Sequence, residues 1–193
     1  MVVRWALTPT TPTTRAVEQP PAVVIPPAVL EHLLSPTPTA AARQIAVAAP
    51  EKLGGRAKST DPALTKVATD EGVRLQGIPN VRSVAAAVYG SHAKKNVMLI
   101  LAAAAPKIPA SDADTFVNNA LIGSDVVVQP ATYEAGSLGG RGVCAEAKSK
   151  GVQYAICGWA DEGSVGIIIC YYTSVAKLQT QFHALRAEIE KVS

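Results

Sequence analysis

The stretch VCAEAKSKGVQYAICGWADEGSVGIIICYY, residues 143–172, decides the fold. It holds three runs of strand-forming residues, at 143–147, 152–159 and 165–172, separated by short polar segments. Those segments are rich in Lys, Ser, Asp and Gly, which are turn formers. The stretch therefore predicts three consecutive antiparallel strands joined by hairpins.

The first of these hairpins places two cysteines opposite each other. If residues 150–151 form a two-residue loop, counting outward from the loop pairs Cys144 with Cys157. The pair falls in the non-hydrogen-bonded class, whose Cα atoms lie about 4.5 Å apart, within the roughly 4.4–6.8 Å that a disulfide spans. We therefore favour a Cys144–Cys157 disulfide. The alternative is two unrelated buried thiols, and a register slip of one residue would produce it.

The cysteine pattern also bears on the compartment. Three cysteines with no histidine between them match neither a zinc site nor a C-x-x-C redox pair. Cys170 lies in an apolar run and is predicted to be buried and free. Three free thiols would fit the cytoplasm, whereas a disulfide indicates an oxidising compartment. Because the hairpin favours the disulfide, we expect an extracytoplasmic protein, secreted or at the cell surface, whose leader or anchor is absent from this chain.

Outside this stretch, ordinary start and stop signals predict the other elements. Asp61 precedes Pro62 and should cap a helix that Gly72 ends. Strands are expected at 83–89, 97–104 and 126–129. Ser111 and Asp114 have the spacing of a capping box ahead of a helix at 115–121. Near the C-terminus, apolar residues recur every three or four positions and predict an amphipathic helix: Val175, Leu178, Phe182, Leu185, Ile189 and Val192. The prediction is an α+β fold, an antiparallel sheet with helices packed on one face.

Composition divides the chain in two. Residues 1–53 contain no glycine and nine of the fourteen prolines, while residues 54–193 contain all fourteen glycines. Proline holds the chain extended, so 1–53 is predicted to be an extended Pro-rich N-terminal arm or linker, and 54–193 a single α+β domain. Extended Pro-rich segments dock on partners by strand addition or in grooves. The apolar residues expected to bind a protein partner are Val23, Val24, Ile25, Leu30, Leu33 and Leu34.

The composition also excludes several classes of function. The net charge of +3 is small and dispersed, which argues against nucleic acid, and 5% aromatic residues leave few platforms for stacking bases. The longest apolar run, 97–106, is shorter than the roughly 20 residues of a membrane helix. No residue pattern indicates catalysis, a metal or a cofactor. The protein is therefore predicted not to be an enzyme.

Four further features are weighed as candidate sites. The glycine-rich loop 136–142 could be an anion-binding nest, yet its spacing fits neither a dinucleotide motif nor a P-loop. A flexible or bulged start to the following strand is the preferred interpretation. Asp161 is expected to accept hydrogen bonds from its turn. Trp159 shares a sheet face with Cys157 and should pack against the disulfide, with contact to a partner as the alternative. His183 falls on the polar face of the last helix and should be solvated.

Several short motifs together resemble a C-terminal domain found in uncharacterised actinobacterial exported or membrane-anchored proteins. These are LGG at 53–55, VYG at 88–90, LGG at 138–140 with Cys144, and CGWAD at 157–161. The resemblance spans roughly residues 50–193, and the Cys…Cys-Gly-Trp-Ala-Asp element is its most specific part. It implies an extracytoplasmic location and a paired Cys144 and Cys157. The family has no assigned activity, so it implies no catalytic residues.

Together these observations predict a non-enzymatic, extracytoplasmic binding or adaptor subunit. Its arm would dock on a protein partner, in a hetero-complex, while the domain contacts another. The alternative is a cell-surface sensor or ligand-binding domain, in which residues 1–50 are only a linker from a lost membrane anchor.

Overall fold

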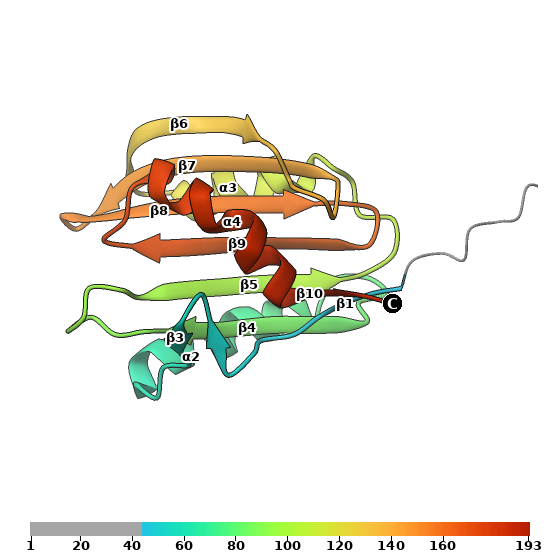
Figure 1. The fold of residues 1–193 in the computed structure, drawn as a ribbon, viewed down its shortest axis with the longest axis horizontal. Helices are drawn as coiled ribbons and strands as arrows, with labels where there is room; N and C mark the ends of the chain where they lie inside the picture. The colour runs from blue at the N-terminus through green and yellow to red at the C-terminus, as the bar shows by residue number, and fades with distance from the viewer. Residues whose placement is uncertain (1–43) are drawn as a thin grey trace, which may run out of the picture. The chain divides into compact units, whose positions relative to one another are not determined.

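The computed structural model of the protein describes residues 44–193. The six arm residues predicted to bind a partner, from Val23 to Leu34, lie outside this part of the chain. Within residues 44–193 the fold is α+β, a six-stranded antiparallel sheet with three helices packed against it (Figure 1). The predicted fold class is confirmed.

The sheet has the strand order β4-β5-β9-β8-β7-β6, and every neighbouring pair is antiparallel. Its strands are β4 (Ser83–Tyr89), β5 (Met98–Ala104), β6 (Asp125–Tyr133), β7 (Arg141–Ser149), β8 (Val152–Ala160) and β9 (Ser164–Tyr171). The three consecutive strands predicted from residues 143–172 are β7, β8 and β9, and they occupy the middle and one side of the sheet. After the β4–β5 hairpin, the next strand in sequence, β6, does not pair with β5 but lies at the far edge of the sheet. The chain then returns through β7 and β8 to β9, which pairs with β5.

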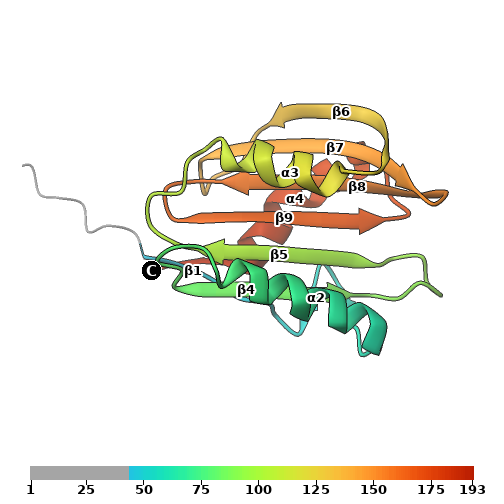
Figure 2. The ribbon, with the colours of Figure 1, turned by 180° about the vertical axis from the view of Figure 1, so that it is seen from behind.

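The helices cover both faces of the sheet. Figures 1 and 2 show α2 (Pro62–Leu75) and α3 (Asp112–Leu121) on one face and α4 (Val175–Ile189) on the other. The expectation that all helices pack on one face is wrong. The physical reason is visible in β5, where all seven residues are buried. A strand that is apolar on both sides needs cover on both sides.

Each face has its own apolar core. The core on the α2–α3 face contains Ala68 of α2, Val117 of α3 and the side chains of β5 and β9 that point toward these helices. The α4 face contains Phe182, Trp159 and Met98, each fully buried. Burial of several such side chains supplies most of the stabilisation of a domain this size.

Of the predicted helix boundaries, the Asp61 cap is confirmed and two others are wrong. Asp61 caps α2, since its Oδ1 accepts from the backbone N–H of Ala63 at 2.9 Å. Gly72 does not end α2. It is buried inside the helix, where a Cβ would lie 3.1 Å from the Cβ of Ala86, so this glycine lets α2 pack closely on β4. The predicted capping box is also wrong: Ser111 makes no side-chain cap hydrogen bond, and the Asp114 carboxylate is used elsewhere.

The hairpin between β7 and β8 has the predicted register. Lys150 and Gly151 have φ of 50° and 78°, the positive values that a type I′ turn requires. The register pairs Cys144 with Cys157, and the two are joined by a disulfide with their Cα atoms 4.1 Å apart. The disulfide prediction is confirmed.

The two ends of the described chain meet in a small separate sheet. β1 (Ile45–Val47) pairs with β10 (Glu190–Val192), and we call this pair the terminal clasp. Two further short strands, β2 (Lys52–Leu53) and β3 (Arg56–Ala57), form a second pair. Val192 therefore lies in β10, 43% exposed, and not on the apolar face of the last helix as predicted, because α4 ends at Ile189.

Residues 44–53 belong to the packed domain, although composition groups them with the arm. Val47 is 4% exposed and Leu53 is fully buried, and both lie in the core under α4. The compositional boundary at 53/54 is thus not a structural boundary. Proline and glycine content separates the two regions, but two buried side chains and a strand pairing decide which residues pack together.

Candidate functional site

The cysteines lie where the hairpin argument placed them, deep in the α4 face. Cys144 is 2% exposed and Cys157 is fully buried. Cys170 is a buried free thiol, as predicted, and its burial raises its pKa to about 11. A thiol that resists ionisation is a poor nucleophile at neutral pH, so Cys170 acts as a small apolar side chain. Trp159 is fully buried in the same core, which agrees with packing and leaves no surface for a partner.

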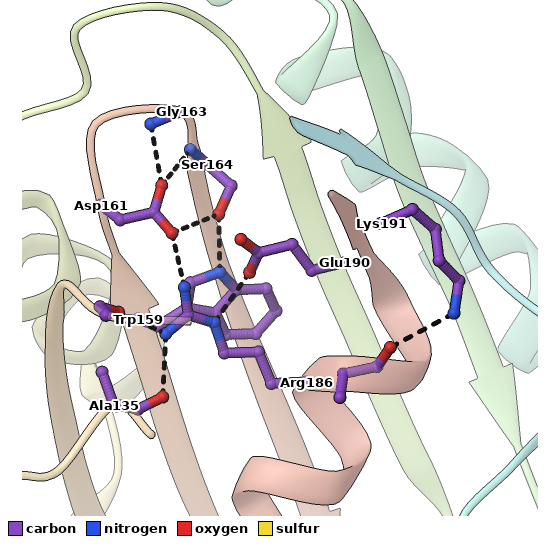
Figure 3. Close-up of polar contacts among 10 residues, drawn as sticks. Ala135, Trp159, Asp161, Gly163, Ser164, Arg186, Glu190 and Lys191 are labelled. Atoms are coloured by element: carbon purple, nitrogen blue, oxygen red, sulfur yellow. Dashed lines mark hydrogen bonds and ion pairs between the residues drawn. The ribbon is translucent and has the colours of Figure 1, made fainter. Parts of the chain in front are cut away.

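The most concentrated group of polar contacts in the described chain surrounds Arg186 of α4 (Figure 3). This arginine is fully buried. Its Nε donates to Glu190 Oε2 at 2.7 Å and its Nη2 donates to Asp161 Oδ2 at 2.5 Å. Its Nη1 donates to two backbone carbonyls, Ala135 O at 2.9 Å and Gly139 O at 2.7 Å. We call Arg186, Asp161 and Glu190, with Trp159 and Ser164, the Arg186 cluster.

Asp161 is held firmly in the turn between β8 and β9. Its Oδ1 accepts from the backbone N–H groups of Gly163 at 2.8 Å and Ser164 at 2.7 Å, which confirms the predicted turn contact. Its Oδ2 accepts from Ser164 Oγ at 3.2 Å, and that hydroxyl accepts from Trp159 Nε1 at 3.0 Å. The Trp159 ring centre lies 5.5 Å from the guanidinium carbon of Arg186. The cluster therefore joins α4 to the β8–β9 turn through fully formed hydrogen bonds.

The glycine-rich loop 136–142 also serves this cluster. Gly136, Gly139 and Gly140 have positive φ, and a Cβ on Gly140 would collide with the carbonyl oxygen of Ala160. This path directs the carbonyls of residues 135 and 139 toward Arg186. The loop therefore binds a cation from its own chain, whereas a nest would direct N–H groups toward an anion.

Arg141, which could have added charge to an anion nest, is paired with Asp114. Its Nε and Nη2 bond the two carboxylate oxygens at 2.6 Å and 3.0 Å. This bidentate contact holds the pKa of Asp114 below its usual value, chiefly through the hydrogen bond. It also explains why Asp114 does not complete the capping box: the carboxylate ties α3 to β7.

The charges of the Arg186 cluster do not balance. Two carboxylates face one guanidinium, and the Glu190 side chain has no exposed surface. Glu190 Oε1 finds no hydrogen-bond partner among residues 44–193. Burial raises the pKa of Glu190. The hydrogen bond and charge of Arg186 lower this pKa, and the nearby Asp161 carboxylate raises it further. The net direction is upward, which favours the protonated acid.

The two histidines in residues 44–193 do not join this cluster. His183 is exposed on α4, as predicted, and its Nε2 lies 2.7 Å from the carbonyl oxygen of Glu134. His92 lies elsewhere, with its Nδ1 2.9 Å from the hydroxyl of Tyr172. Within residues 44–193, no group of three metal-ligating side chains gathers. None of the helices described is both long and apolar enough to cross a bilayer.

The most apolar exposed segment is on β6, the last strand of the sheet. Val126, Val127 and Val128 are 37%, 50% and 39% exposed, and we call them the valine edge. The pairing of β6 with β7 shifts register on both sides of Val128, so the strand is irregular. Within residues 44–193, β6 has a bonded neighbour on one side only, and free edges of this kind readily pair with another strand.

No family model matches this chain, and no curated protein is similar to it.

Sequence reasoning missed the Arg186 cluster and the valine edge. The signal for the cluster was present, since Arg186 follows Phe182 by four positions and Glu190 follows Arg186 by four. Such spacing puts both charges on the helix face that Phe182 and Ile189 define. A charged pair on an apolar face indicates a buried ion pair. The valines of β6 were identified as a strand, but nothing local indicates that this strand lies at the edge of the sheet.

Proposed function

We propose that the chain is a protein-binding or adaptor subunit that acts in an oxidising, extracytoplasmic compartment. The valine edge is the observation that carries the proposal. Three consecutive valines on an edge strand, each more than a third exposed, form an apolar surface next to unpaired backbone groups. Isolated apolar residues on a surface are ordinary, but a run of them on a strand edge is typical of interaction sites.

The surface suits an extended, apolar segment of a partner protein. Strand addition gives affinity through main-chain hydrogen bonds and selects for side chains that fit between the exposed ones. On β6 the usable length is short, because Pro130 has no N–H to offer and the register shifts disturb the strand beside it. A partner strand of about four residues along 125–128 fits these limits.

The disulfide supports the compartment. Cys144–Cys157 is buried and lies in register between two central strands, and disulfides persist in oxidising environments. The resemblance to exported and membrane-anchored proteins points the same way. In this proposal the apolar residues of the arm, with Ile25 and Leu33 as anchors, hold a second part of the partner complex.

The test is capture of partners from an extract of the native source, using the full chain and quantitative mass spectrometry. Val127→Asp should abolish capture of the partner that binds the valine edge, because the substitution puts a charge where apolar surface is buried. Val67→Asp is the matched control, since Val67 is 48% exposed and lies on α2. The combined variant Ile25→Asp with Leu33→Asp tests the arm separately.

The outcomes separate the alternatives. Loss of one identified partner with Val127→Asp, but not with Val67→Asp, supports the adaptor. If all variants keep every partner, neither surface binds protein and the sensor or ligand-binding interpretation replaces this one.

A further inference from the structure

Glu190 occupies a position where its charge state affects both a buried cluster and the terminal clasp. It caps the C-terminus of α4, where its backbone N–H donates to Arg186 O, and it begins β10, where it pairs with Val47 of β1. Its side chain points back into the Arg186 cluster (Figure 3). The same residue therefore contributes its backbone to the terminal clasp and its side chain to the Arg186 cluster.

The hydrogen bonds identify which carboxyl in the cluster carries a proton. Asp161 accepts four donors: two backbone N–H groups, the Ser164 hydroxyl and Arg186 Nη2. Glu190 accepts one, from Arg186 Nε, and its other oxygen has no partner among the described residues. Hydrogen-bond donors stabilise an ionised carboxylate, and Glu190 has fewer of them than Asp161. Burying an oxygen that has no hydrogen-bond partner costs much less free energy when the carboxyl is a neutral acid than when it is an ionised carboxylate.

Among residues 44–193, no second cation faces Glu190. Arg186 faces it from α4, and Asp161 faces it from the β8–β9 turn. β1, the strand that pairs with it, consists of Ile, Ala and Val and brings no ionisable group. Asp161 and Arg186 neutralise each other, which leaves an ionised Glu190 as an uncompensated buried charge.

We propose that Glu190 is a proton-dependent latch: protonated, it keeps the terminal clasp closed, and loss of its proton to solvent opens the pairing of β1 with β10. The ionised side chain must reach water, and its way out is to withdraw with β10. Opening then breaks the bond from Ala48 N–H to Ile189 O and the paired bonds between Gln44 and Ser193.

The direction of the pH dependence follows from the raised pKa of Glu190 in the closed state. When the clasp is open, Glu190 has an ordinary pKa and releases its proton first as pH rises. The closed state is therefore fully favoured below the ordinary glutamate value and loses this contribution as pH rises through the higher pKa of the closed form. The clasp is tighter in acid than at neutral pH.

The experiment uses the full chain and two measurements. Carboxyl carbon NMR of Glu190 should show a titration above the ordinary glutamate range. Hydrogen exchange at the Ala48 amide, corrected for its intrinsic rate, should accelerate by about tenfold for each pKa unit of the shift between pH 4.5 and pH 8. Glu190→Gln, which imitates the protonated acid, should remove that acceleration, while Glu162→Gln, at an exposed position beside Asp161, should leave it unchanged.

A Glu190 carboxyl that titrates at or below the ordinary value would overturn the proposal. So would a clasp whose exchange, after correction, has the same pH dependence in the wild-type chain and in Glu190→Gln. The NMR titration is independent of the variant, so a Glu190→Gln chain that folds poorly still leaves the proposal open to refutation.

Discussion

The two faces of the sheet are stabilised in different ways. On the α2–α3 face, helices contact the strands through Ala, Val, Leu and Ile side chains, and the Arg141–Asp114 pair lies at its margin with both side chains nearly 40% exposed. On the α4 face, the apolar core surrounds a disulfide and a fully buried arginine. Apolar contacts tolerate small shifts of a helix, whereas a guanidinium with four directed hydrogen bonds tolerates few. The difference indicates that directed hydrogen bonds fix the position of α4, whereas buried apolar surface holds α2 and α3 against the sheet.

The α4 face also depends on residues that precede Gly54, and truncation should show the largest effect. A chain that starts at Gly54 lacks β1 and the buried side chains of Val47 and Leu53. Each contributes about 1.5–3 kcal/mol, so the loss should be about 3–6 kcal/mol. A chain that starts at Gln44 should unfold at the same denaturant concentration as the full chain. Equal stability of the two truncations would show that 44–53 contribute nothing.

Arg186→Met should be the most damaging single substitution on the α4 face. It leaves Asp161 and Glu190 buried without their cation, and breaking a buried pair in this way costs about 3–5 kcal/mol. Val117→Ala on the opposite face removes two methyl groups from a fully buried side chain and should cost about 1–2 kcal/mol. Urea unfolding of both variants at pH 7 measures these losses.

A double variant sharpens this comparison. Without Arg186, two buried carboxyl groups lack a cation, and adding Glu190→Gln leaves only one of them able to ionise, so it should restore part of the lost stability. Additive losses instead would mean that the two residues do not interact.

The sequence predicts the strands well because their determinants are local. The register of β7 and β8 follows from a two-residue turn, and the Asp61 cap from one side chain and the amides that follow it. Which face of the sheet a helix covers is not determined by local sequence. The 3.6-residue period of α4 identifies an apolar stripe but carries no information about which sheet face receives it. This is why all helices were expected on one face.

The candidate site was less predictable for the same reason. The clasp joins residues 44–47 to residues 190–193, a pairing that no turn or local pattern specifies. Arg186 bonds the loop at 135–139 and the turn at 161, so its burial depends on two segments that are distant in sequence. Only the i, i+4 charge pair with Glu190 on an apolar face was readable in advance.

The disulfide should contribute less than the Arg186 cluster. Cys144→Ala with Cys157→Ala opens a loop between residues 13 apart in sequence, and the loss should be about 2–3 kcal/mol. Peptide mapping of the wild-type chain without reductant should recover Cys144 and Cys157 bonded and Cys170 alkylated only after unfolding. Recovery of Cys170 in a bridge would contradict both the pairing and the assigned compartment.

The helix N-termini should show the smallest difference between the faces. α2 relies on a local cap, in which Asp61 accepts from the backbone N–H of Ala63 at 2.9 Å. α4 has a long contact from Lys177 N to Ser174 Oγ at 3.4 Å, and a second, tertiary cap. Glu146 of β7, 7% exposed, accepts from the backbone N–H of Val175 at 2.7 Å. A carboxylate here also interacts favourably with the helix dipole.

Asp61→Ala should therefore cost about 1 kcal/mol, the usual value for loss of an N-cap. Ser174→Ala should cost roughly 0.5 kcal/mol or less, because Glu146 still satisfies the first amide of α4. Adding Glu146→Gln to Ser174→Ala removes the charge from the remaining cap and should bring the total to about the cost of Asp61→Ala. Urea unfolding of the four chains measures these differences. If Ser174→Ala alone costs as much as Asp61→Ala, the tertiary cap is ineffective, and the N-terminus of α4 is held no more firmly than that of α2.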